Sequence, residues 1–264
     1  DEIFKARATL LLVSALYGTN FGCVKILGEH LDPSFSASIR FILAFSVFLP
    51  FMLDKSVVEG KKNCMELVNG NFEVVCMCTT DPNNSDFVDA IQITTKEASR
   101  ISHLKNPSPF IAIAKIPKVD FKIEIKPFLF FLDQINDPGN LGTIIRTLDW
   151  FGFNQIICSP ETVDAYNSKT VMASMGSIFR VKVIYKEFRA VIEKFKSHKV
   201  ITTQINGENI YKQTIHKNSI IVFGNEANGI SKQIENFSDQ QIKIPKFGQA
   251  ESLNVSTSVG IIAN

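Results

Sequence analysis

The sequence has little of several features that would identify a class of protein quickly. Its 264 residues carry a formal net charge of only +2, from 28 basic and 26 acidic side chains. This balance excludes a protein that binds nucleic acid through overall positive charge, although an RNA enzyme needs only a local basic face. The five cysteines include no CxxC pair, and the four histidines are scattered. A disulfide scaffold and a metal site are therefore not predicted, and a reducing compartment is favoured.

Long apolar runs are confined to the first fifth of the chain. Residues 8–27 and 34–53 each approach the roughly 20 residues that cross a bilayer, and they carry single charges at Lys25 and Arg40. Hydropathy favours a membrane hairpin over a buried hairpin in a soluble core. The segment LYGTNFGCVKILGEHLDPSFSASIRFILAF also resembles the start of EamA-type drug/metabolite transporters. We expect a membrane-tethered protein if residues 8–53 are native to the chain, and otherwise a cytoplasmic one.

Two α/β regions follow the apolar segment. In the first, residues 55–118, the pattern of Val58, Met65 and Leu67–Val68 suits the buried face of a helix, and Phe72–Met77 suits a strand. In the second, residues 119–264, apolar strands alternate with amphipathic helices. This alternation is typical of a parallel sheet covered on both faces. Because such sheets bind ligands at the carboxyl ends of their strands, the loops that follow the strands are the candidates for a site.

The first of these loops, residues 136–146, follows a predicted strand at residues 128–132. Pro138 and Gly139 are expected to turn the chain, and Asn140 is expected to cap the next helix. Gly142 would allow a close backbone approach. Arg146 lies inside that helix, where its guanidinium could hold a phosphate or a carboxylate.

Two further loops carry unusual polar groups. In residues 220–231, Gly224 and Gly229 flank Glu226 and expose backbone groups that could bind an adenine or ribose edge, without a P-loop pattern. In residues 244–258, four small polar side chains crowd the start of a predicted helix: Ser252, Asn254, Ser256 and Ser258. No GxSxG motif and no nucleophile–histidine–acid arrangement is present, so a hydrolase is not supported.

Three segments in this order, NDPGNLGTIIRT, FGNEANGIS and IPKFGQAESLNVSTSVGI, resemble the three motifs of the SpoU (TrmH-like) branch of the SPOUT RNA methyltransferases. The resemblance extends from about Ser56 to Asn264. It implies an α/β fold: a parallel-sheet SPOUT domain with a C-terminal trefoil knot over 119–264, preceded by a small α/β RNA substrate-binding domain over 55–118. In this chain an apolar helical hairpin over 1–54 would come first.

The resemblance also implies a chemistry. S-adenosyl-L-methionine is the expected methyl donor, a ribose 2′-hydroxyl of structured RNA (rRNA or tRNA) the expected acceptor, and a homodimer the expected assembly. No metal is implied. The catalytic residues would be Arg146, Asn140, Glu226 and Asn254. The donor-binding residues would be Phe223, Gly224, Asn225, Glu226, Gly229, Ile244, Ser252, Leu253, Asn254 and Val255. Because arginine is a very weak base in water, we expect Arg146 to position the ribose through the RNA phosphate.

Several alternatives stay open. The chain could be a non-catalytic RNA-binding relative, or a membrane transporter fragment fused to a methyltransferase. Residues 1–54 could come from an artificial joining of two genes, from a real fusion or from an organelle-targeting extension. We favour the joining, because nothing links transport to ribose methylation. In the family, the helix after the third motif is expected to continue beyond Asn264 and to complete the knot and the dimer contact. We therefore expect knotting and dimerisation to depend on this continuation.

Overall fold

The computed structural model describes residues 55–70, 72–102, 104–117 and 122–264. It divides the chain into two compact units, Asp1–Lys55 and Ser56–Asn264. The predicted membrane hairpin over residues 8–53 lies outside the described residues. Within the described ranges, no helix has both the length and the apolar character needed to cross a membrane.

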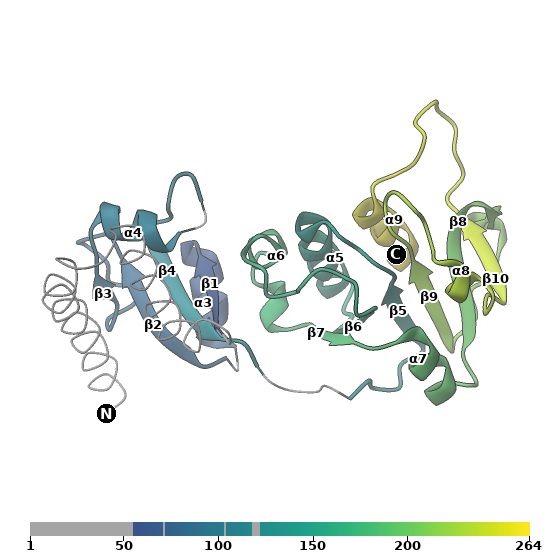
Figure 1. Cartoon of the computed structure of the whole chain (residues 1–264), viewed down its shortest axis with the longest axis horizontal. Helices are drawn as coiled ribbons and strands as arrows, with labels where there is room; N and C mark the ends of the chain where they lie inside the picture. The colour runs from purple at the N-terminus through teal and green to yellow at the C-terminus, as the bar shows by residue number, and fades with distance from the viewer. Residues whose placement is uncertain (1–54, 71, 103, 118–121) are drawn as a thin grey trace, which may run out of the picture. The chain divides into compact units, whose positions relative to one another are not determined.

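A four-stranded sheet with two helices occupies residues 55–115 (Figure 1). Its strands lie in the order β1-β4-β2-β3, with β2 antiparallel to β4 and parallel to β3. The elements are β1 (Lys55–Glu59), α3 (Lys61–Asn69), β2 (Val74–Thr79), β3 (Ile91–Gln92), α4 (Thr95–Ile101) and β4 (Phe110–Lys115).

The predicted helical face in this region was partly wrong. Val58 lies in strand β1, and the helix begins only after Gly60, whose φ of 98° breaks the chain direction. Helix α3 buries Leu67 as predicted, together with Asn63 and Cys64, while Met65 and Val68 are exposed. The run of β-branched residues before Gly60 favours a strand, which explains the error.

A six-stranded sheet with helices on both faces forms the described part of the chain from residue 122 onward (Figure 1). All of its strand pairs are parallel, in the order β10-β8-β9-β5-β6-β7, so the predicted α/β fold with a parallel sheet is confirmed. The strands are β5 (Phe128–Leu132), β6 (Gln155–Cys158), β7 (Lys182–Tyr185), β8 (Lys199–Asn209), β9 (Ser219–Phe223) and β10 (Gln240–Lys243). The helices are α5 (Pro138–Trp150), α6 (Ser168–Ser174), η1 (Ser177–Phe179), α7 (Phe188–Lys194), η2 (Ile210–Lys212), α8 (Lys232–Glu235) and α9 (Val255–Ala263).

Strand β5 shows why its sequence is apolar without interruption. Phe130 and Leu132 point into a core cluster that contains residues of α5, α6 and α9. Leu129 and Phe131 point into a second cluster, with residues of α7 and α8. Successive side chains of a strand point to opposite faces, so a strand covered on both faces must be apolar at every position.

Helices α5 and α6 approach closely at Gly142. A Cβ on this residue would lie 2.5 Å from the carbonyl oxygen of Thr170 and 2.6 Å from the Cβ of Ala173. This finding confirms the predicted close backbone approach. The two helices must move apart to accept any side chain at this position.

We therefore expect Gly142→Ala to lower the free energy of unfolding by about 1–3 kcal/mol, in spite of the better helix propensity of alanine. Urea denaturation would measure the change. Gly260→Ala in α9 is the matched control, because its Cβ would make only an ordinary contact, 3.5 Å from the Cγ2 of Thr147. Equal stability of the two variants would contradict the tight packing at Gly142.

Candidate active site

Hydrogen bonds between side chains join the three loops that follow β5, β9 and β10. The Nδ2 of Asn140 donates to the Oε1 of Glu226 at 2.7 Å, and the Nδ2 of Asn254 donates to the Oδ1 of Asn140 at 2.9 Å. Strands β5 and β9 are neighbours in the sheet, so their carboxyl ends meet at one edge. Three of the four predicted catalytic residues are thus brought together in one hydrogen-bonded chain.

The start of α5 differs from the prediction. Asp137 is the N-cap, and one of its carboxylate oxygens accepts a hydrogen bond from the backbone N–H of Asn140 at 2.7 Å. Pro138 and Gly139 are the first residues of the helix instead of a turn before it. An acidic N-cap followed by proline suits a helix start well, which explains why Asp137 takes this position. The side chain of Asn140 is therefore available to bridge the other two loops.

Asn254 has both ends of its side-chain amide occupied. It is the N-cap of α9, and its Oδ1 accepts from the backbone N–H and the hydroxyl of Ser256. Because these two hydrogen bonds use only the Oδ1, the Nδ2 of Asn254 can donate to Asn140. The predicted crowding of small polar groups at this helix start is confirmed, and it fixes the direction of the Asn254 amide.

The loop after β9 is closed by its own backbone. Asn225 and Gly229 exchange two backbone hydrogen bonds, at 2.8 and 2.9 Å. The side chain of Asn225 is buried, with its Nδ2 donating to the carbonyl of Gln134 at 2.7 Å and its Oδ1 accepting from the N–H of Ala227 at 2.8 Å. This closure holds Glu226 at the exposed tip, facing Asn140.

Two residues of the site have no counterpart in the sequence predictions. Asp133 is only 2% exposed, and its Oδ2 accepts from the backbone N–H of Ser231 at 2.7 Å. Gln134 has a φ of 55°, a left-handed conformation that is uncommon for a residue with a side chain. Both directly follow β5, and a polar pair at the carboxyl end of an apolar strand was the signal that could have identified them.

Arg146 lies apart from this network. It is exposed, and its guanidinium forms no hydrogen bond or ion pair with any residue in the described part of the chain. It lies six positions after Asn140 in the helix, so the two side chains point roughly 120° apart and lie about 9 Å apart along the helix axis. The guanidinium is therefore accessible to a ligand from outside the described chain.

The predicted donor-binding residues differ in accessibility. Phe223 and Val255 are buried in the core, so only their backbone groups could contact a ligand. Ile244 is half-buried, whereas Ser252 is exposed and Leu253 retains 49% of its accessible surface. Gly224 is packed so closely against Gly229 and Ile230 that it cannot carry a side chain.

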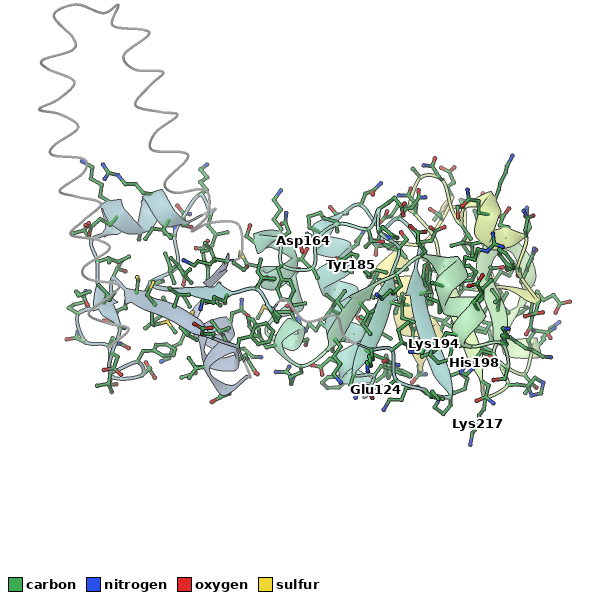
Figure 2. The ribbon with its side chains drawn as sticks, turned by 60° about the horizontal axis from the view of Figure 1, so that its bottom comes forward. Glu124, Asp164, Tyr185, Lys194, His198 and Lys217 are labelled. Carbon is green, nitrogen blue, oxygen red and sulfur yellow. The ribbon has the colours of Figure 1, made fainter. Side chains whose placement is uncertain are left out.

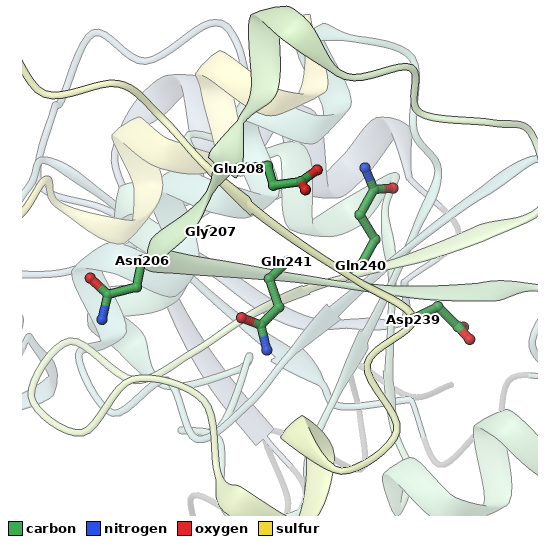
Figure 3. A pocket seen from close by; sticks show the side chains of 6 residues that line it. All are labelled: Asn206, Gly207, Glu208, Asp239, Gln240 and Gln241. Carbon is green, nitrogen blue, oxygen red and sulfur yellow. The ribbon is translucent and has the colours of Figure 1, made fainter.

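A polar cavity of about 290 Å³ lies elsewhere, between β8 and β10 (Figure 3). Its lining residues are Asn206, Gly207, Glu208, Asp239, Gln240 and Gln241. It arises from a bulge in β8. Thr202 and Glu208 pair with two adjacent residues of β10, so the β8 residues between them bulge out of the strand pairing. None of the predicted site residues lines this cavity, so we do not assign the site to it.

The sequence profile of the SpoU rRNA Methylase family matches residues 127–264. A Bacillus subtilis 23S rRNA (guanosine(2553)-2′-O)-methyltransferase is 30% identical over 167 residues, 62% of this chain and 66% of that protein. An uncharacterized tRNA/rRNA methyltransferase of Borreliella burgdorferi is 30% identical over 66% of this chain and 85% of that protein.

Solved structures share the fold. A TrmH-family structure from Porphyromonas gingivalis covers 81% of this chain and 89% of its own, with a TM-score of 0.69 and 26% identity. An AdoMet-bound rRNA methyltransferase from Sinorhizobium meliloti covers 80% and 86%, with a TM-score of 0.69 and 25% identity. The family profile spans more than half of the chain and includes all three loops that meet at the site. The chain therefore belongs to the SpoU rRNA methylase family.

Proposed function

We propose that this chain transfers a methyl group from S-adenosyl-L-methionine to a ribose 2′-hydroxyl of ribosomal RNA. The observation that carries the proposal is the chain of hydrogen bonds from Asn254 through Asn140 to Glu226. It unites the three family motifs at the carboxyl edge of a parallel sheet, where ligands of such sheets bind. The ribose-methylating relative of Bacillus subtilis supports the position of the acceptor.

The residues of the site fit this methyl donor. The half-exposed side chain of Leu253 and the half-buried Ile244 offer apolar surface to an adenine ring. The hydrogen-bonded loop at Gly224 offers backbone groups to a ligand, and the carboxylate of Glu226 lies nearby for a cationic ligand. When bound, the donor supplies an electrophilic methyl group on a sulfonium centre.

The chain's own residues would supply position and charge. A ribose hydroxyl is a weak acid and a poor nucleophile, so it must be aligned with the methyl carbon and lose its proton. Arg146 is permanently charged and exposed, so it would hold an RNA phosphate and orient the adjacent ribose. Asn140 and Asn254 would keep the carboxylate of Glu226 in one place during the reaction.

Incubation with donor labelled in the methyl group and deproteinised ribosomal RNA tests the proposal. We expect label in RNA, and we expect it in dinucleotides that survive alkali, because a methylated 2′-hydroxyl cannot attack the adjacent phosphate. Label in alkali-sensitive mononucleotides would indicate base methylation and contradict the proposed acceptor. Transfer to tRNA alone would contradict the proposed substrate.

The other expectations from the family resemblance stay predictions. They are the trefoil knot, the homodimer and the domain boundaries at 54/55 and 118/119.

A further inference from the structure

The segments that lead into strands β5, β8 and β9 lie next to one another at the amino edge of the large sheet. The carbonyl of Ile123 accepts from the Nζ of Lys194 at 3.1 Å, and the Nε2 of His198 lies 3.1 Å from the carbonyl oxygen of Lys126. The backbone N–H of Asn218 donates to the carbonyl of Pro127 at 2.7 Å. Residues 122–127, 194–199 and 216–219 therefore lie side by side.

This surface is strongly basic. Seven lysines come from these three segments and the start of β7, and we call them the amino-edge lysine face: Lys122, Lys126, Lys182, Lys194, Lys196, Lys199 and Lys217. Figure 2 shows Lys194, His198, Glu124 and Lys217 along one edge of the sheet, with Asp164 toward the opposite side.

Acidic groups on this face do little to offset the lysines. Glu124 is the one acidic residue in the three segments, and it pairs with Lys182 and Lys126. These partners, Lys182 first, lower its pKa, so it is ionised at neutral pH and neutralises part of their charge. Asp239 lies beside the start of β8, where its Oδ2 accepts from the N–H of Val200. Over the three segments together with Lys182 and Asp239, seven lysines thus face two carboxylates, whereas the whole chain has a net charge of +2.

The opposite, carboxyl edge has the reverse charge. The loops over residues 133–140, 159–169, 186–187, 224–231 and 244–254 contain three lysines and seven carboxylates, with Lys232 and Arg146 beyond them in helices α8 and α5. The predicted methylation site therefore lies in a region that repels a polyanion at long range. We therefore expect another surface of the large-sheet domain to supply the long-range attraction for RNA.

We propose that the amino-edge lysine face binds phosphates of a second segment of the same structured RNA whose ribose enters the site. This inference rests on the proposed function. Strands of five residues span roughly 17 Å, so one folded RNA can touch both edges of the sheet. Lysines in such numbers, without base-reading groups, suit contacts to the RNA backbone, which position a substrate without reading its sequence.

The double variant Lys199→Gln/Lys217→Gln tests the proposal. Both lysines are exposed, and their side chains form no ion pair within the described ranges, so folding should be unaffected. With deproteinised ribosomal RNA as probe, we expect affinity to fall on the order of tenfold at 0.1 M salt. We also expect the slope of log K against log salt to decrease by about one and a half, since each phosphate contact contributes roughly 0.7–0.9. Donor binding should not change.

The matched control is Lys212→Gln/Lys232→Gln, which also removes two exposed lysines of the same sheet domain but outside the face. It should retain the wild-type salt slope. An unchanged slope in the Lys199/Lys217 variant, or equal losses in both variants, would overturn the proposal. A third result would also overturn it: the Lys199/Lys217 variant binds phosphatidylserine vesicles more weakly than the wild type does, while its affinity for RNA stays the same. If the wild-type chain methylates no RNA, the proposed function itself fails, and that result is separate from the comparison of salt slopes.

Discussion

Arg146→Ala is expected to reduce methyl transfer to RNA by about a thousandfold or more, while the dissociation constant of the methyl donor changes by less than about threefold. Positioning and charge stabilisation by one group contribute effects of this size. Donor binding should persist because Arg146 is exposed and lies outside the hydrogen-bonded network that joins the three loops. Single-turnover transfer of labelled methyl groups and calorimetry with the donor would measure the two quantities.

Two further variants make this result specific. Arg146→Lys keeps the charge but loses the planar fork of the guanidinium, so it should recover only a small part of the rate. Arg189→Ala removes another exposed arginine, which pairs with Glu193 on α7, and it should leave the rate unchanged. If Arg146→Ala lost donor binding while remaining folded, the positioning role would be wrong.

Gly224→Ala is expected to abolish detectable donor binding. A Cβ at this position would overlap the carbonyl group of Gly229 and the backbone nitrogen of Ile230. Because these are backbone atoms, the loop can accept alanine only by breaking the pair of hydrogen bonds between Asn225 and Gly229. Glu226 would then leave its place beside Asn140. We also expect the free energy of unfolding to fall by about 1–3 kcal/mol.

Gly248→Ala is the matched control, since it makes the same substitution in the loop after β10, where a Cβ would meet open space. It should bind the donor as the wild type does. Normal donor binding by folded Gly224→Ala would show that this loop takes no part in the donor site.

The sequence predicted the fold correctly where a regular pattern of apolar residues runs along the chain. Uninterrupted apolar runs such as Phe128–Leu132 predicted strands covered on both faces, and the structure confirms them. The prediction failed at Val58, because one apolar residue fits a strand and a helix equally well when the break at Gly60 is ignored.

The candidate site was predictable to a similar degree. The rule that ligands bind at the carboxyl ends of strands identified the loops of Asn140, Glu226 and Asn254, and these residues do meet. The predicted N-cap of α5 was wrong, because Asp137 takes the position expected for Asn140. The polar pair after β5 could have marked Asp133 and Gln134 as candidates, but no local pattern reveals their contacts with residues about ninety positions away.

The bridge between Asn140 and Asn254 spans 114 residues of sequence. Forming it requires closure of a very long loop, and contacts of this kind are made late in folding because their entropic cost must be met by structure already present. During synthesis, the residues of all six strands, up to Lys243, leave the ribosome before Asn254 does. A nascent chain can thus hold its sheet and its amino-edge lysine face while its carboxyl edge is unfinished. On the proposed function and the proposed role of this face, each newly made molecule would bind RNA before it could transfer a methyl group.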